Sequence, residues 1–307
     1  MNGIEFKGVH HRFGDNQVLR GLDLEVGEGE VVALLGRNGA GKTTSIQALL
    51  GFLEPNAGET RLLGTPSLEL GPEQRERVGF VSEGHKLYGW MRLSRVLDFE
   101  ANTRRNFDRD AAERTLEALG LKPKQWVQSL SRGQRAQVAL TIALAGDPDV
   151  LILDDPAMGL DAVMRRDFLD AMIDLLGQEG RCVLVSSHIL SDVERVADRV
   201  AILHEGALIV NAELDDLRTR VQRRFVMCEP GAEPPPAYLA GVLRCQRKRE
   251  GFELLTLDWD AETEAQAHAM GWRWGEPVST NLEELFFDLT VADANGDLTR
   301  ALSAGVA

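Results

Sequence analysis

The sequence predicts an α/β protein in which a largely parallel sheet is buried between helices, followed by a small α+β domain. Short apolar runs recur through residues 1–210, helix-period segments separate most of them, and the composition changes after residue 210. Such alternation places ligands at the carboxyl ends of the strands. The apolar runs are VVALLG (31–36), VGFVS (78–82), VLILD (150–154), CVLVSS (182–187) and RVAILH (199–204).

The segments around this predicted sheet have their own patterns. Residues 4–26 alternate more regularly than the other apolar runs and predict antiparallel strands. Residues 108–120 have helical periodicity, with Asp108 available to cap the start and Gly120 to end the last turn.

The C-terminal part predicts a second, smaller domain. We place a boundary near 212–222, which gives domains 1–211 and 222–307. Residues 231–239 are proline-rich, and residues 242–258 follow as two strand-like runs around a Glu250-Gly251 turn. With a helical segment at 261–272, this order suggests a split βαβ arrangement without a catalytic motif.

The closing segment 281–289 predicts an amphipathic helix. Its apolar face would pack against the small domain or form a dimer contact. The residues of that face are Leu282, Leu285, Phe286 and Leu289.

Composition excludes several classes of protein. The formal charge of -14 over 307 residues, without a long Lys/Arg cluster, argues against nucleic acid as a partner. No apolar run approaches the roughly 20 residues that cross a bilayer, and the start lacks a signal-peptide pattern, so we expect a cytoplasmic protein. Three widely spaced cysteines predict reduced thiols: Cys182, Cys228 and Cys245.

A glycine-rich loop predicts a phosphate site. The stretch GRNGAGKT, from Gly36 to Thr43, follows an apolar strand and precedes a helical segment, which is the context of a P-loop. Its glycines let backbone N–H groups face an anion at a helix N-terminus. Lys42 would reach the β- and γ-phosphates, and the Thr43 hydroxyl would bind Mg²⁺.

Two adjacent carboxylates end the strand at 150–154. Neighbouring side chains on a strand face opposite ways, so Asp154 and Asp155 can serve one ligand only if the strand stops between them. Asp154 would hold the magnesium from across the site, and Asp155 would swing toward the attacking water.

Three further motifs complete an ordered set: LSRGQ at 130–134, Asp161, and His188 after the strand at 182–187. With the P-loop and Asp154, they make residues 1 to about 210 resemble the nucleotide-binding subunit of ATP-binding cassette (ABC) transporters. The details look most like bacterial ABC-2-type exporters.

The resemblance implies a P-loop ABC ATPase core with an antiparallel β subdomain and a helical subdomain. It also implies two cassettes that face head to tail and sandwich ATP and Mg²⁺. Residues expected to bind the nucleotide in one cassette are Phe13, Gly36, Asn38, Gly39, Gly41, Lys42, Thr43 and Thr44.

The second cassette would complete each site. Ser131, Gly133 and Gln134 would reach the partner's γ-phosphate, Asp161 would lie at the seam, and His188 would contact the γ-phosphate. Structural alternatives stay open. Ser131 and Gln134 form a capping box, a lone histidine is often structural, and Phe13 could pack a core instead of stacking on adenine.

Three positions depart from the family pattern. Asp155 stands where the family has a catalytic glutamate, so its carboxylate is about 1.5 Å nearer the backbone and slow hydrolysis is expected. Glu83 replaces a glutamine that senses magnesium and the γ-phosphate, and Arg132 replaces the first glycine of the signature. The expected catalytic residues are thus Asp155, His188 and Glu83, and the expected metal ligands are Thr43, Asp154 and Glu83.

The resemblance also implies partners. A permease encoded separately would dock on residues 85–99 at the inner face of the cell membrane, although Tyr88, Trp90 and Met91 there could instead be core. The chain would pair with itself as a slow ATPase, or with a different cassette that supplies the glutamate. A soluble ABC ATPase without a permease is a further alternative. The transported substrate cannot be read from the sequence.

Overall fold

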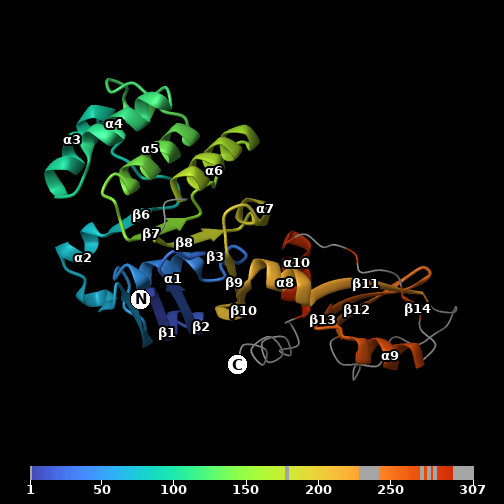
Figure 1. Ribbon diagram of the computed structural model, residues 1–307. Coiled ribbons are helices and arrows are strands. Elements are labelled where there is room, and N and C mark those ends of the chain that lie inside the picture. Colours follow the sequence, from blue (N-terminus) through green and yellow to red (C-terminus); the bar gives the residue numbers. More distant parts are fainter. Residues whose placement is uncertain are drawn as a thin grey trace. The chain divides into compact units, whose positions relative to one another are not determined.

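The computed structural model describes residues 2–176, 180–227, 242–269, 273–274, 278 and 282–292. The chain divides into two compact units, Met1–Leu208 and Ile209–Ala307. Figure 1 shows the elements of each unit. The predicted boundary near 212–222 falls shortly after this division, and the domain limits 1–211 and 222–307 stay predictions.

The centre of the first unit is a largely parallel sheet, as the sequence predicts. Its strand order in the described part of the chain is β10-β9-β3-β8-β7-β6, and the pairs β9/β3, β3/β8, β8/β7 and β7/β6 are parallel. β7 and β8 are buried along their whole length, which explains their unbroken apolar sequence. The strands are β3 (Val31–Leu35), β6 (Val78–Val81), β7 (Val150–Asp154), β8 (Cys182–Ser187), β9 (Arg199–His204) and β10 (Ala207–Glu213), which begins in the first unit and continues into the second.

An antiparallel sheet forms a second layer of this unit and confirms the prediction for residues 4–26. Its order is β2-β1-β4-β5. Helix α1 (Lys42–Leu49) contacts both β4 and β7, and its Ile46 and Leu49 belong to one core with residues of both sheets. The strands are β1 (Asn2–Phe13), β2 (Asn16–Gly27), β4 (Ala57–Leu62) and β5 (Thr65–Pro66).

Helices α3, α4 and α5 form a helical group with its own core, which includes Leu97, Leu116 and Val138. Asp108 caps α4 by accepting a hydrogen bond from the Ala111 N–H at 2.8 Å, and Gly120 follows the helix with φ +76°, as predicted. The helices of the first unit are α1, α2 (Pro72–Glu76), α3 (Leu93–Thr103), α4 (Arg109–Ala118), α5 (Arg132–Leu144), α6 (Ala162–Leu176) and α7 (Leu190–Val193), with the short 3-10 turns η1 (Ser67–Glu69) and η2 (Val127–Ser129).

The second unit is an α+β fold, as predicted. Its sheet order is β12-β13-β11-β14. β13 and β14 are both antiparallel to β11, so they run parallel to each other with β11 between them, and α9 lies between them in the chain, as in a split βαβ unit. The predicted proline-rich segment 231–239 lies outside the described residues. The elements are α8 (Leu214–Arg220), β11 (Val221–Met227), β12 (Val242–Lys248), β13 (Gly251–Leu257), α9 (Ala261–Ala269), β14 (Arg273–Trp274) and α10 (Leu282–Ala292).

Helix α10 buries the face that the sequence predicts. Leu282, Leu285 and Leu289 are fully buried, Phe286 is half-buried, and the helix contacts β12 of its own unit. This face therefore packs the second unit, which was one of the two predicted roles.

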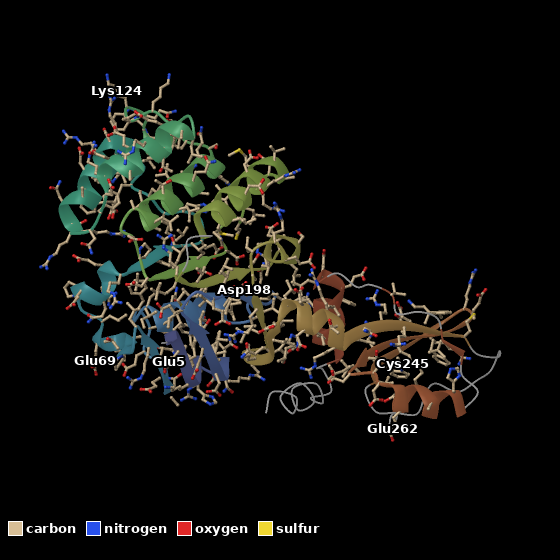
Figure 2. All side chains as sticks on the ribbon, in the orientation of Figure 1. Glu5, Glu69, Lys124, Asp198, Cys245 and Glu262 are labelled. Carbon is tan, nitrogen blue, oxygen red and sulfur yellow. The ribbon has the colours of Figure 1, made fainter. Side chains whose placement is uncertain are left out.

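Burial singles out one place in the molecule. Glu69, Asp198 and Glu262, labelled in Figure 2, are among the many acidic side chains at the surface. Among the described residues, the buried carboxylates are Asp154, Asp155 and Asp192, and Lys42 is the buried lysine or arginine. Since buried charges need partners, the pair at the end of β7 marks a candidate site. No helix within the described ranges has both the length and the apolarity needed to cross a membrane.

Candidate functional site

The loop between β3 and α1 has the shape of an anion cradle. Gly39 and Gly41 have φ of +85° and +110°, which side chains rarely adopt. A Cβ at Gly36 would lie 2.7 Å from the Leu203 carbonyl oxygen, and one at Gly41 would lie 2.8 Å from Leu19 Cδ2. Tight packing explains Gly36 and Gly41, and positive φ explains Gly39. The loop ends at the N-terminus of α1, where anions are favoured.

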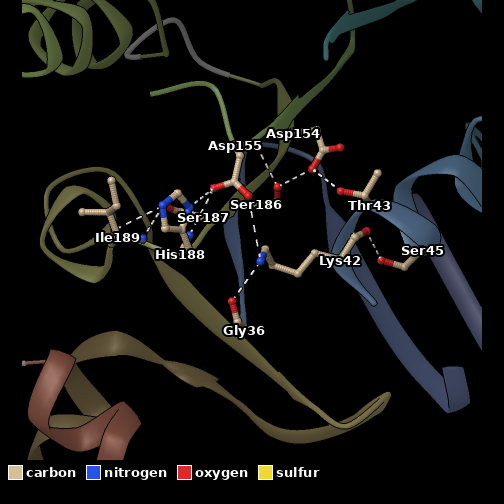
Figure 3. Close-up of polar contacts among 10 residues, drawn as sticks. All are labelled: Gly36, Lys42, Thr43, Ser45, Asp154, Asp155, Ser186, Ser187, His188 and Ile189. Carbon is tan, nitrogen blue, oxygen red and sulfur yellow. Dashed lines mark hydrogen bonds and ion pairs between the residues drawn. The ribbon is translucent and has the colours of Figure 1, made fainter. Parts of the chain in front are cut away.

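Lys42 begins α1 and is only 5% exposed. Its Nζ donates a hydrogen bond to the Gly36 carbonyl oxygen at 2.8 Å and lies 3.9 Å from Asp155 Oδ2 (Figure 3). The ammonium group thus has one short contact and one long ion pair. Since it can donate three hydrogen bonds, it retains capacity for an anion in the cradle.

Asp154 is the last residue of β7, as predicted. The parallel register places it opposite Ser186, whose Oγ donates to Asp154 Oδ1 at 2.7 Å. Thr43 Oγ1 donates to the same oxygen at 3.3 Å. These contacts join the P-loop to the neighbouring strands.

Asp155 leaves the strand because its backbone turns into the left-handed region, with φ +44°. Its N–H donates to Ser186 Oγ at 2.9 Å, so one serine holds both aspartates. This turn resolves the problem of the adjacent carboxylates. Asp154 faces Thr43, and Asp155 faces Lys42 and His188 (Figure 3).

His188 binds Asp155 directly. Its backbone N–H donates to Asp155 Oδ1 at 3.2 Å, and its Nδ1 lies 2.7 Å from the same oxygen. Since an ionised carboxylate only accepts, Nδ1 carries the proton of this bond. His188 also lines a cavity of about 490 Å³ with the P-loop residues Asn38 and Gly39. The imidazole therefore connects Asp155 to the space beside the P-loop.

The environment of Asp154 fits a hard cation. Burial raises the pKa of Asp154, hydrogen bonds from Ser186 and Thr43 oppose this, and the Asp155 charge adds to it. A carboxylate whose charge is unfavourable gains most from a cation, and Mg²⁺ prefers oxygen ligands with several waters or phosphate oxygens. Within the described residues there is no cluster of three or more His, Cys, Asp or Glu that could hold a metal. Magnesium here would be held by Thr43, Asp154 and phosphate oxygens.

Replacing Asp154 with Asn is expected to stabilise the nucleotide-free protein at neutral pH, raising its melting temperature by a few degrees. The folded-state pKa of Asp154 lies above the ordinary value of 3.8, so the ionised carboxylate destabilises the fold above that raised pKa. The difference from wild type should shrink as the pH falls toward 4. Thermal scans from pH 7 to pH 4 measure it, with the exposed Asp110→Asn as control. A lower melting temperature for Asp154→Asn at pH 7 would contradict the expectation.

Phe13, Glu83 and Thr44 are the remaining predicted residues of this half-site. Phe13 ends β1 and is 53% exposed, with its ring edge-to-face on the buried His11 at 4.6 Å. It is therefore available for stacking and is not a core residue. Glu83 follows β6 and is exposed, and it makes no hydrogen bond or ion pair with any described residue. Thr44 is half-buried in the first turn of α1.

The signature residues lie at the start of α5. Ser131 and Gln134 form the predicted capping box: Ser131 Oγ accepts from the Gln134 N–H at 3.1 Å, and Gln134 Oε1 accepts from the Ser131 N–H at 3.0 Å. Gly133 is buried where a Cβ would overlap Met164. The nearest atom is the Met164 Cε, 2.3 Å from such a Cβ, at the flexible end of that side chain.

Asp161 and Arg132 lie in or beside the segment that joins β7 to α6. Asp161 Oδ1 accepts from the N–H groups of Val163 and Met164, so it caps α6. Arg132 packs over Gly159, where an added Cβ would lie 3.0 Å from Arg132 Nη1. Among the described residues, no hydrogen bond or ion pair links the signature residues or Asp161 to Lys42, Asp155 or His188.

Two site residues were not predicted. Ser186 binds both aspartates, and its signal was a polar residue near the end of an apolar strand that precedes His188. His85 is buried, and its Nε2 lies 2.7 Å from the Pro156 carbonyl oxygen. Nothing in the sequence indicates this contact, because the two residues are 71 positions apart.

Comparison with known proteins decides the family. The ABC transporter family model matches residues 19–158. The bacitracin transport ATP-binding protein BcrA of Enterococcus faecalis is 32% identical over 219 residues, which is 71% of each chain. The chain belongs to the ABC transporter family. It is an ATP-binding subunit, and the predicted ABC ATPase fold is confirmed.

Other known proteins are similar to most of this ABC subunit. The aliphatic sulfonates import ATP-binding protein SsuB of Pseudomonas putida is 34% identical over 75% of this chain and 88% of its own. A solved structure of the ATP-binding subunit of an ABC transporter is 28% identical, with a TM-score of 0.62, over 70% of this chain and 92% of its own. One of the two named relatives belongs to an import system, so relationship alone does not give the direction of transport.

Proposed function

We propose that this ABC subunit binds Mg-ATP at the P-loop, hydrolyses it slowly in a dimer, and drives export through a separate membrane permease. The observation that carries the proposal is the convergence of Lys42, Asp155 and His188 beside the cradle. A buried cation, a carboxylate and an imidazole next to an anion site are the groups that phosphoryl transfer to water uses.

Each group has a proposed role. The backbone from Gly36 to Gly41 and the Lys42 ammonium would hold the phosphates, together with Asn38 inside the loop and Thr44 in the first turn of α1. Thr43 and Asp154 would hold magnesium, with Glu83 as a further oxygen ligand. Phe13 would stack on the adenine.

Hydrolysis would use the Asp155–His188 pair. Asp155 would orient the attacking water and His188 would contact the γ-phosphate. The shared hydrogen bond at 2.7 Å would keep both side chains in place. The shorter reach of Asp155 compared with glutamate makes slow turnover the expected result.

The partner cassette would complete the site. Ser131 is exposed at the N-terminus of α5, which favours an anion supplied by another chain. Gly133 and Gln134 would contact the same γ-phosphate, and Asp161 would lie at the interface between the two cassettes. Size-exclusion chromatography with Mg-ATP tests this: wild type should dimerise with nucleotide, and Ser131→Arg should stay monomeric.

A second candidate function follows from Asp155 itself. The chain would pair with a different cassette that carries the usual glutamate, and its own site would mainly bind ATP. Purified alone, it would then show very low turnover. A soluble ABC ATPase without a permease is the remaining alternative, and membrane pulldown separates it from both transport roles.

A groove on the helical group supports the proposal that the subunit docks on a permease. It has a volume of about 530 Å³, and its apolar lining includes Trp90, Phe99 and Trp126. Trp90 is 68% exposed, and the Tyr88 ring contacts those of Trp90 and Phe99 at 6.0 and 5.6 Å. Exposed aromatic side chains around a hollow are typical of binding anchors, so a short helix of the permease would fit here. The subunit would then be cytoplasmic and peripheral on the inner face of the cell membrane.

Replacing Trp90 with Ala is expected to lower recovery of the subunit with membranes by about an order of magnitude, since truncation of an aromatic anchor costs about 2 kcal/mol or more. ATP turnover of the purified chain should change by less than about twofold, because Trp90 is outside the nucleotide site. Phe52→Ala is a matched control, because Phe52 is an exposed aromatic outside the groove. Equal loss of membrane recovery in both variants would reject the groove as the docking site.

A further inference from the structure

His85 lies in the connection between β6 and α3, two residues after Glu83. It is 4% exposed, and its backbone has φ +49°. A buried histidine in the left-handed region is uncommon and costs free energy, so the surrounding structure must compensate.

The compensation is a hydrogen bond to the loop after β7. His85 Nε2 lies 2.7 Å from the Pro156 carbonyl oxygen. A carbonyl oxygen only accepts, so Nε2 must carry the proton and act as the donor.

Pro156 immediately follows Asp155, whose backbone is itself in the left-handed region. Ser186 Oγ accepts from the Asp155 N–H, and the Asp155 carbonyl accepts from the Met158 N–H at 3.0 Å. Because proline has no N–H, its carbonyl is the only backbone group through which residue 156 can be held. His85 therefore anchors the turn from one side while Ser186 anchors it from β8.

We propose that His85 is a positioning residue for ATP hydrolysis, which holds the Asp155–Pro156 turn so that the Asp155 carboxylate points at its water. The inference rests on the proposed function and adds a residue to it. The position of this turn matters more with aspartate than with glutamate at position 155, because the shorter side chain cannot make up for a shifted backbone. A displacement near 1 Å can cost about a hundredfold in rate.

Two variants of His85 separate the hydrogen bond from other effects. Gln places its amide nitrogen near the position of Nε2 and keeps the donor, whereas Asn is one carbon shorter and cannot reach Pro156. Asn also tolerates positive φ better than most residues, so His85→Asn should fold. The two variants therefore carry the same amide group but differ in how far it extends from the backbone.

The expected result is a change in the rate of hydrolysis without a change in the affinity for nucleotide. His85→Asn should lower kcat by between about tenfold and a hundredfold, with the affinity for Mg-ATP within about twofold of wild type because the P-loop is untouched. His85→Gln should recover most of the rate. Hydrogen exchange of the Met158 amide should be faster in His85→Asn than in wild type and slower again in His85→Gln.

Other outcomes overturn the inference. If both variants turn over ATP like wild type, the hydrogen bond does not position Asp155. If both lose activity equally while their melting temperatures match wild type, reach to Pro156 is not what matters. Wild type that fails to bind Mg-ATP would reject the proposed function, and the inference with it, before either variant is compared.

Discussion

Replacing Lys42 with Ala is expected to abolish measurable binding of Mg-ATP and to lower hydrolysis by about two to three orders of magnitude. Lys42 is the buried lysine beside the cradle, and its Nζ has one short hydrogen bond, to Gly36. Without the ammonium group, the cradle loses the buried cation that would balance part of the charge of the β- and γ-phosphates. Isothermal titration calorimetry and phosphate release measure the two effects.

The matched control for Lys42→Ala is Lys124→Ala. Lys124 is exposed on the helical group, as labelled in Figure 2, and its side chain lies outside the site. That variant should bind and hydrolyse ATP like wild type. Retained affinity in Lys42→Ala, with a folded protein by circular dichroism, would reject the P-loop as the nucleotide site.

Replacing Asp155 with Glu is expected to raise kcat, by up to about a hundredfold. The Asp155 carboxylate reaches His188 at 2.7 Å but only approaches Lys42, at 3.9 Å. One more methylene lets the carboxylate reach about 1.5 Å farther from the backbone. Steady-state turnover at saturating Mg-ATP measures the gain.

Asp155→Asn is the control, because it keeps the size of the side chain and removes its charge. It should lower turnover further and leave ATP binding intact. If Asp155→Glu turns over no faster than wild type, the short side chain is not what limits hydrolysis. A gain that appears only when a second cassette is added would instead favour the unequal pair.

The parallel strands were the easiest part of the fold to predict. Residues 150–154 and 182–187 were expected as strands and are β7 and β8 with the same limits. A strand buried on both faces must be apolar throughout, so its pattern survives in the sequence without knowledge of its neighbours. The split order of β13, β11 and β14 was harder, because strand pairing depends on contacts that are distant along the chain.

The groups of the site were predicted better than their contacts. Gly41, Lys42, Asp154 and His188 could be found because motif spacing reflects a local need, such as a tight turn or a strand end. Ser186 and His85 were missed. Each acts across the fold, Ser186 through the register of β7 and β8 and His85 through a bond to Pro156.

Local pattern therefore specified the family, the P-loop and the strand that ends at Asp154, because these depend on residues close together in the chain. The left-handed backbone of Asp155, the bond from His188 that occupies its carboxylate, and the His85 bond to Pro156 arise only when separate elements pack together. Backbone strain at a non-glycine residue persists only where surrounding contacts compensate for it, and those contacts exist only in the folded chain.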